Sequence, residues 1–292
     1  MSLLVKFNLI LILCFGIALV PAQLITRNLL EQNARRQIEQ QARLMLQTAL
    51  ATRGYTNKQI KPLLAPRLAD EFLPQSVPAY SATEIFNSLR DTHPEYTYKE
   101  ATLNPTNPRD RVVEWEADVV NVFRNDEKRT EIINTRDTPL GPSLYLARPI
   151  KITDQGCLSC HTTPELAPAS VVKLYGPSGG YGWKMNEIIG AQIVSVPMAV
   201  PLKMADQANK AMLVSLVGVF LFILVLLNIL LWFTIIRPIR RLSRMADEVS
   251  TGNLEVPEVR LTSHDEVGVL AGSFNRMRIS LVKALKMLED ME

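Results

Sequence analysis

The chain has 292 residues, which is enough for one or two domains with accessory segments. Hydrophobic residues make up 47% of it, and the mean hydropathy of +0.08 is high for a purely soluble protein. The formal net charge is only +3, and Lys and Arg are scattered without interleaved aromatic residues, so the composition argues against a nucleic-acid-binding protein. The apolar excess is concentrated in two runs, as a membrane protein requires.

The first apolar run covers residues 7–25 and follows Lys6. A run of this kind is typical of either a transmembrane helix or a signal peptide. The small-residue stretch 20–22 (VPA) resembles a cleavage site and keeps the second interpretation open. Both interpretations send the segment that follows across a membrane.

The second apolar run covers residues 211–236, contains no charged residue and is long enough to span about 30 Å of hydrocarbon. Four arginines follow it, at positions 237, 240, 241 and 244, so this end is predicted to face the cytoplasm. We therefore predict a two-pass protein of the inner (plasma) membrane. Its anchor would cover residues 1–26, and residues 27–205 would form an extracytoplasmic domain.

Residues 157–161 read Cys-Leu-Ser-Cys-His, which is the attachment signature of c-type haem. In such a site both thiols bond to the haem edge and the histidine gives an imidazole nitrogen to the iron. A structural zinc site needs four ligands, and the remaining Cys14 lies in the first apolar run. A redox pair or a plain disulfide does not require the histidine. Because the segment is predicted to be extracytoplasmic, we predict covalent haem c on Cys157 and Cys160, with His161 as an iron ligand.

The segment after the first run is predicted to be a helix over about residues 27–53, because good helix formers dominate it. Its apolar residues recur at spacings of three and four and form one narrow stripe. The stripe consists of Leu30, Ala34, Ile38, Ala42, Met45 and Ala49.

Beyond residue 55, frequent prolines indicate short elements and many turns. A short helix is expected over residues 82–91, and five stretches read as strands because several alternate apolar and polar residues. These strands are expected over residues 96–103, 114–123, 129–134, 143–152 and 190–198. The pattern predicts an α+β domain on a mostly antiparallel sheet, with the haem motif in the loop after the fourth strand.

A glycine-rich stretch covers residues 175–183. It lacks the Gly-Lys-Ser/Thr of a phosphate-binding loop, so phosphate binding is not expected. We expect its glycines to let the backbone approach the haem closely while Tyr181 and Trp183 cover the haem face.

Two amphipathic helices are predicted after the second apolar run, separated by residues 252–253 (Gly-Asn) and a connector that carries Leu254, Val256, Val259 and Leu261. The first helix has a heptad seam at Ile239, Leu242, Ala246 and Val249. The second seam consists of Val267, Leu270, Phe274, Met277, Leu281, Ala284 and Leu288. Two such helices cannot bury their seams alone, whereas two copies in a homodimer would form a parallel four-helix coiled-coil bundle. A pair of unrelated surface helices would not need strict heptad spacing.

This C-terminal part resembles a HAMP domain, the signal relay of two-span receptors. The resemblance rests on Pro238 just past the membrane, on Gly252, on residues 265–268 (DEVG) and on both seams. It covers about residues 234–288, and we expect the domain itself over 237–288. Because such receptors pack both spans into a membrane bundle, the resemblance favours an uncleaved first anchor and a homodimer through the spans and the HAMP helices.

The extracytoplasmic part resembles a family of c-type haem domains with a PAS-like fold, long listed as a domain of unknown function. The resemblance covers about residues 30–200 and implies haem binding, a redox-sensing or gas-sensing role and a PAS-like antiparallel sheet with helices. The matching stretches are 77–80 (VPAY), 98–101 (YKEA), 103–108 (LNPTNP), 146–149 (LARP), 157–161 (CLSCH), 190–192 (GAQ) and 196–197 (VP).

The sequence departs from that family at the second axial ligand. At least some members use a cysteine of the N-terminal helix, whereas here Cys14 lies within the apolar run. We nominate Met45, on the apolar stripe, as the replacement; the alternatives are that Met45 is a core residue, or that His93, Met185 or Met198 is the ligand. A five-coordinate iron with an open position is the remaining alternative and would favour gas binding, whereas a Met/His pair would favour redox sensing.

The leading hypothesis is a membrane-bound, homodimeric haem sensor without enzymatic activity. A small gas or a redox partner would change the haem, shift the packing of the spans and the HAMP bundle, and so signal to a separate cytoplasmic protein. The alternatives are a membrane-anchored c-type cytochrome that transfers electrons and a haem-free disulfide domain. An electron carrier gains nothing from a heptad relay across the membrane. No catalytic constellation stands out, and His264 beside Asp265 is expected to be a solvated turn residue.

Overall fold

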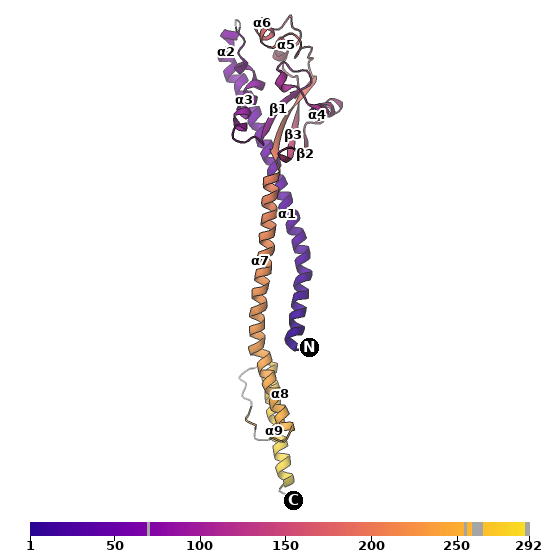
Figure 1. Cartoon of the computed structure of the whole chain (residues 1–292), viewed down its shortest axis with the longest axis vertical. Helices are drawn as coiled ribbons and strands as arrows, with labels where there is room; N and C mark the ends of the chain where they lie inside the picture. Colours follow the sequence, from indigo (N-terminus) through magenta and orange to yellow (C-terminus); the bar gives the residue numbers. More distant parts are fainter. Residues whose placement is uncertain (69–70, 254–255, 259–264, 290–292) are drawn as a thin grey trace. The chain divides into compact units, whose positions relative to one another are not determined.

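The computed structural model describes residues 1–68, 71–253, 256–258 and 265–289. The chain divides into two compact units (Figure 1). One unit is Ile25–Asn209, and the other combines Met1–Leu24 with Lys210–Glu292.

Within the described residues, four strands of the first unit form one antiparallel sheet. They are β1 (Thr97–Thr102), β2 (Ile132–Thr138), β3 (Gly141–Lys151) and β4 (Ile188–Pro197), in the order β1-β4-β3-β2. This arrangement, with its flanking helices, confirms the predicted α+β class.

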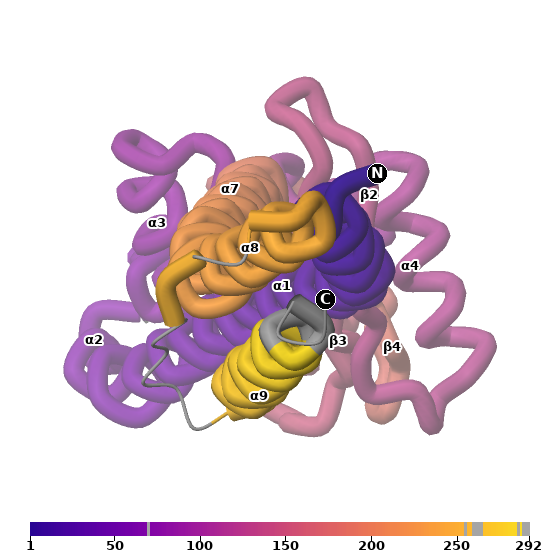
Figure 2. Tube along the Cα trace, turned by 90° about the horizontal axis from the view of Figure 1, so that it is seen from below, coloured from indigo at the N-terminus to yellow at the C-terminus, as the bar shows by residue number. Residues whose placement is uncertain are grey.

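The strands bury side chains on both faces of the sheet because successive residues point in opposite directions. Leu144 and Leu146 of β3 join a cluster with α1 (Leu3–Tyr55) and α3 (Pro78–Arg90). The intervening Tyr145 and Ala147 join a second cluster with α4 (Glu114–Asn125). The helices α1 and α3 therefore cover one face and α4 covers the other, as Figures 1 and 2 show.

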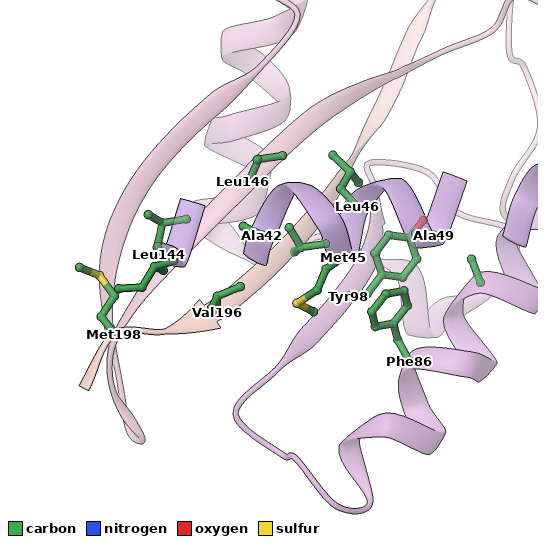
Figure 3. Close-up of a cluster of buried hydrophobic side chains, with 13 residues drawn as sticks. Ala42, Met45, Leu46, Ala49, Phe86, Tyr98, Leu144, Leu146, Val196 and Met198 are labelled. Atoms are coloured by element: carbon green, nitrogen blue, oxygen red, sulfur yellow. The ribbon is translucent and has the colours of Figure 1, made fainter. Parts of the chain in front are cut away.

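The predicted apolar stripe of α1 packs on the first face (Figure 3). Its buried members are Ala34, Ile38, Ala42, Met45 and Ala49, with Leu46 added. The helix runs from Leu3, so the predicted helix over residues 27–53 is one part of it. A π-helical turn, Thr56–Ile60, joins it to α2 (Lys61–Leu68).

The prediction of a strand over residues 114–123 was wrong. These residues form α4, because Val119, Val120 and Phe123 recur at helical spacing and bury one face. The carboxylate of Glu116 also accepts the backbone N–H of Val113 at 2.9 Å, which stabilises the first turn of the helix. The β-branched valines suggested a strand, but tertiary packing outweighs that propensity.

The haem motif also differs from its predicted position in a loop. It lies on the short helix α5 (Gln155–His161), which follows β3 and precedes α6 (Ala169–Tyr175). The predicted short helix over residues 82–91 corresponds to α3, which begins earlier because Pro78 occupies its first turn. The predicted strand over residues 129–134 corresponds to β2, displaced toward the C-terminus.

In the second unit, one polar and one aromatic pair of side chains connect the first apolar run with α7 (Ala199–Leu231). Asn8 and Asn228 exchange two carboxamide hydrogen bonds of 2.8 Å, and the rings of Phe15 and Phe220 stack with centroids 3.8 Å apart. Among the described residues, two helices are long and apolar enough to cross a membrane, with mean hydropathies of 2.6 and 3.0 in their most apolar windows. A reciprocal amide pair satisfies both side chains in an apolar environment, which fits a membrane protein.

A π-helical turn, Trp232–Ile236, joins α7 to α8 (Arg237–Ser250), which packs on α9 (Glu266–Glu289). Gly252 ends α8 with a φ of +95°, a conformation that favours glycine. The carboxylate of Asp265 caps α9 by accepting the backbone N–H groups of Val267 and Gly268 at 3.1 Å. The positive φ of Gly252 and the cap formed by Asp265 explain why a glycine and the DEVG motif (residues 265–268) occur at these positions.

The contact between α8 and α9 follows the predicted seams in part. Its buried core consists of Leu242, Met245, Val249, Val256, Ala271 and Phe274. Of the other seam residues, Ala246 and Val267 pack against this core, whereas Ile239, Leu270, Met277, Leu281 and Ala284 are exposed in the single chain. Of the remaining predicted positions, Leu254, Val259, Leu261, His264 and the side chain of Leu288 lie outside the described part of the chain.

Candidate haem site

The helix α5 brings the three predicted haem-attachment residues together. The side chain of Asp154 caps the helix by accepting the Gly156 N–H at 2.8 Å. Cys157, Cys160 and His161 are spaced i, i+3 and i+4, so they share one face of the helix. Both cysteines are free thiols, and all three side chains are half-buried. This arrangement leaves the thiols and the imidazole accessible from the same side.

The hydrogen bond of His161 fixes which ring nitrogen is available. Its Nδ1 lies 2.7 Å from the carbonyl oxygen of Gly180. A carbonyl oxygen only accepts, so Nδ1 carries the proton and Nε2 is the unprotonated nitrogen of the neutral ring. Burial lowers the pKa of His161, which further favours the neutral ring, although the Gly180 carbonyl opposes this effect. An imidazole oriented in this way is the form that binds a metal ion.

Trp183 stacks on the ring of His161, with centroids 3.8 Å apart and planes 14° apart. The backbone N–H of Trp183 donates to the His161 carbonyl at 3.2 Å. The tryptophan expected to cover the haem face therefore packs on the imidazole itself. This contact restricts rotation of the imidazole.

A second loop holds the Gly180 carbonyl in place. The Asn104 amide donates to the Tyr181 carbonyl at 3.1 Å, and its oxygen accepts the Gly180 N–H at 3.2 Å. Gly180 has a φ of +82°, and a Cβ there would overlap the side chain of Thr106. Only glycine allows this approach. The 103–108 loop and the glycine-rich loop together position His161.

The surroundings of Cys157 disfavour a thiolate. Burial raises the pKa of its thiol, and the Asp154 carboxylate raises it further, whereas Arg53 and Lys61 act in the opposite direction. Nucleophilic and redox-active cysteines have lowered thiol pKa values instead. The surroundings of Cys157 do not provide this lowered thiol pKa.

A buried polar network beside Cys157 was not predicted from the sequence. The guanidinium of Arg53 on α1 pairs with the carboxylate of Glu100 on β1, which is 5% exposed. Tyr98 donates its hydroxyl to Glu100 at 2.7 Å, and the Gln192 amide lies 3.4 Å from the Tyr98 oxygen. Burial by itself lowers the pKa of Arg53, but Glu100, Tyr98 and Cys157 together outweigh this effect and the pKa is raised. Three of these partners lie in the stretches 98–101 and 190–192, which resemble the haem-domain family. That resemblance was the only signal in the sequence that could have pointed to the network.

The structure places Met45 in the hydrophobic core, with Phe86 and Tyr98 in the same cluster (Figure 3). Met45 precedes Arg53 by eight residues on α1, about 12 Å along the helix axis. The contacts of Met45 are therefore those of a core residue, and its ligation of iron stays a prediction.

The other candidate ligands are also dispersed. Met198 is 2% exposed in the same core cluster as Met45, whereas Met185 is 41% exposed. His93 is exposed and lies 3.8 Å from the Glu95 carboxylate. Among the described residues, no group of three or more His, Cys, Asp and Glu side chains is arranged to hold a bare metal ion.

Comparisons with known proteins identify both parts of the chain. The family model Tll0287-like (Tll0287) matches residues 31–197, and that of the HAMP domain matches residues 230–283. A similar solved structure is that of the cyanobacterial heme-protein Tll0287, with 17% identity and a TM-score of 0.39, covering 52% of this chain and 94% of that chain. The curated proteins gave no match. Because the first family match spans more than half of the chain, the protein belongs to the Tll0287-like family, and it carries a HAMP domain after its second apolar helix.

Proposed function

We propose that residues 27–205 bind haem c covalently through Cys157 and Cys160, with His161 as an axial ligand. The observation that carries this proposal is the geometry of α5, where both thiols share a face with an imidazole. The Gly180 carbonyl holds the proton on Nδ1 and leaves Nε2 for iron. When bound, the haem would supply a redox-active iron that also binds small gases if one axial position is open.

The protein is further proposed to be a signalling protein rather than an enzyme, because its haem-family domain is joined to a HAMP domain. We place the membrane spans at residues 1–26 and 211–236, and the HAMP domain at residues 237–288. The arginines after the second span support a cytoplasmic HAMP domain and an extracytoplasmic haem domain. The output would pass to a separate cytoplasmic protein.

A homodimer is proposed because α8 and α9 of one chain leave part of the predicted seams uncovered. Leu270 and Met277 are 52% and 58% exposed, although both occupy seam positions. A second copy would cover these apolar side chains in a four-helix bundle. The exposed residues therefore mark the surface where two copies meet.

The Arg53–Glu100 pair offers a route from the haem site to α1. Arg53 lies close enough to Cys157 to affect the pKa of its thiol. A change of charge at the haem would alter the electrostatic balance of this pair, because the buried Glu100 carboxylate is poorly screened by solvent. A difference of a few kcal/mol is enough to reset a two-state equilibrium.

Two measurements on the full chain test this function. Reduced spectra with and without carbon monoxide separate the stimuli: bands unchanged by the gas indicate redox sensing, and shifted bands indicate gas sensing.

Disulfide cross-linking between Leu270→Cys residues of two chains then reports on the HAMP seam. A sensor predicts that cross-linking changes when the haem is reduced or binds the gas. Equal cross-linking in every haem state would favour the alternative, an anchored electron-transfer cytochrome.

A further inference from the structure

A cavity of about 480 Å³ lies at the β1 edge of the sheet, where residues of both α3 and α4 line it, and is separate from the residues that surround His161. Its floor is formed by neighbouring strands β1 and β4, where Thr97 and Ser195 lie opposite each other in the register. Residues of α3, three residues of the segment 109–113, the first turn of α4 and one residue of β2 complete the walls. This volume is within the range of small-molecule binding sites.

Four cationic side chains line the cavity, and two of them are paired with carboxylates. Lys99 lies 2.6 Å from the Glu116 carboxylate and also donates to the Arg111 carbonyl at 2.7 Å. Arg109 pairs with Glu84 outside the cavity and with Asp110, 3.8 Å away, on its wall. These contacts neutralise two of the four positive charges.

The other two cations, Arg90 and Arg136, have no carboxylate partner among the described residues. The guanidinium of Arg136 lies 4.1 Å from the centre of the Trp115 ring. Such a contact orients the guanidinium without neutralising it. An oriented guanidinium presents two parallel N–H groups, the geometry that a carboxylate matches.

Neutral hydrogen-bonding groups accompany these charges. Asn87, Thr97 and Ser195 line the cavity, and within the described part of the chain their side chains have no hydrogen-bond partner. Polar groups without protein partners are expected to bind water or a ligand. The cavity thus combines excess positive charge with free donors.

We propose that this cavity binds a small organic anion that carries two or more carboxylates. Arg136 and Arg90 project from different elements, β2 and α3, so each is available to a separate carboxylate. The amide and hydroxyl groups of the floor and wall would bind the remaining polar atoms of the ligand. Such a ligand would give the domain a second input that is independent of the haem.

Isothermal titration of the full haem-loaded chain in nanodiscs with succinate tests the proposal. We expect saturable binding of one succinate per chain, and acetate to bind at least tenfold more weakly because it has one carboxylate. Arg136→Gln and Arg90→Gln should each weaken succinate binding at least tenfold. The control Arg124→Gln changes an exposed arginine of α4 that lies 3.7 Å from Glu187 and does not line the cavity, so it should leave binding unchanged.

The absorption spectrum of each variant shows whether the haem site and the fold are intact. Loss of succinate binding with an unchanged spectrum would support a separate anion site. The proposal would be overturned by absence of succinate binding at millimolar concentration, or by equal affinity in the wild type and in both cavity variants. An equal response to sodium chloride at matched ionic strength would overturn it as well, because that result indicates a general salt effect.

Discussion

Strand β1 turns Glu100 to one face of the sheet and Lys99 to the other, and the two ion pairs that they form are about equally buried but have different neighbours. Arg53 reaches Glu100 from α1, and Tyr98 donates a further hydrogen bond to the carboxylate. Lys99 and Glu116 form their ion pair on the wall of the cavity described above. Neighbouring residues of one strand can therefore serve a structural network and an open polar site. Substitutions on the two faces should have different consequences.

The largest expected effect is on stability at the Arg53–Glu100 pair. Glu100→Gln should lower the free energy of unfolding by about 3 kcal/mol, because it leaves the half-buried Arg53 without a charged partner. Lys99→Gln should cost less, about 1.5 kcal/mol, because the equally buried Glu116 still accepts the backbone N–H of Val113 and borders a cavity that water can enter. Denaturant titration of both variants measures the difference. Equal losses would contradict the contrast between the faces.

A smaller effect is expected where the glycine-rich loop holds His161. Gly180→Ala should cost about 2 kcal/mol, from its positive φ and its overlap with Thr106, and should alter the absorption spectrum. The matched control is Gly182→Ala, whose φ is +81° but whose Cβ would meet no atom within 4 Å. It should cost about 1 kcal/mol and leave the spectrum unchanged. An altered spectrum in the control alone would count against the role of Gly180.

The cavity face should also show a pH dependence. Burial raises the pKa of Asp110 from 3.8 to about 6, and Glu100 adds to this shift while Arg109 and Lys99 oppose it. The folded state then binds more protons than the unfolded state between about pH 4 and 6, so stability should fall as pH rises through this range, by about 1–2 kcal/mol. Asp110→Asn should abolish that slope in thermal unfolding curves. The exposed Asp118→Asn serves as control, and the same loss of slope there would refute the assignment.

The smallest effect on stability is expected in the core beside α1. Met45→Leu conserves volume and should cost less than about 1.5 kcal/mol. If Met45 ligates iron, as the sequence predicts, the reduced spectrum should lose its low-spin bands, whereas Met198→Leu in the same cluster should retain them. An unchanged spectrum in the Met45 variant would leave this residue as part of the core.

The sequence predicted those elements whose signals are local. The spacing of residues 157–161 marked the haem motif, and Gly252 and Asp265 marked the ends of the two HAMP helices before their geometry was known. The α4 helix was mistaken for a strand because its valines favour strands, and only packing against the sheet decides between the two.

The polar groups around the site could not be predicted, because their partners are distant in sequence. Arg53 and Glu100 are 47 residues apart, and His161 and Gly180 are 19 apart. The family resemblance included residues 98–101 and 103–108 without indicating what they contact. The fold supplies that information by joining α1 to β1 and the two loops to each other.

The most direct test of the account is whether the haem is covalent. We would record the absorption spectrum of the full chain, produced with a c-haem maturation system, after acidic organic solvent has removed non-covalent haem. The account predicts that the haem stays with the wild-type chain and is extracted from a Cys157→Ala/Cys160→Ala variant. A wild-type chain that loses all of its haem to the solvent, or never carries any, would contradict it.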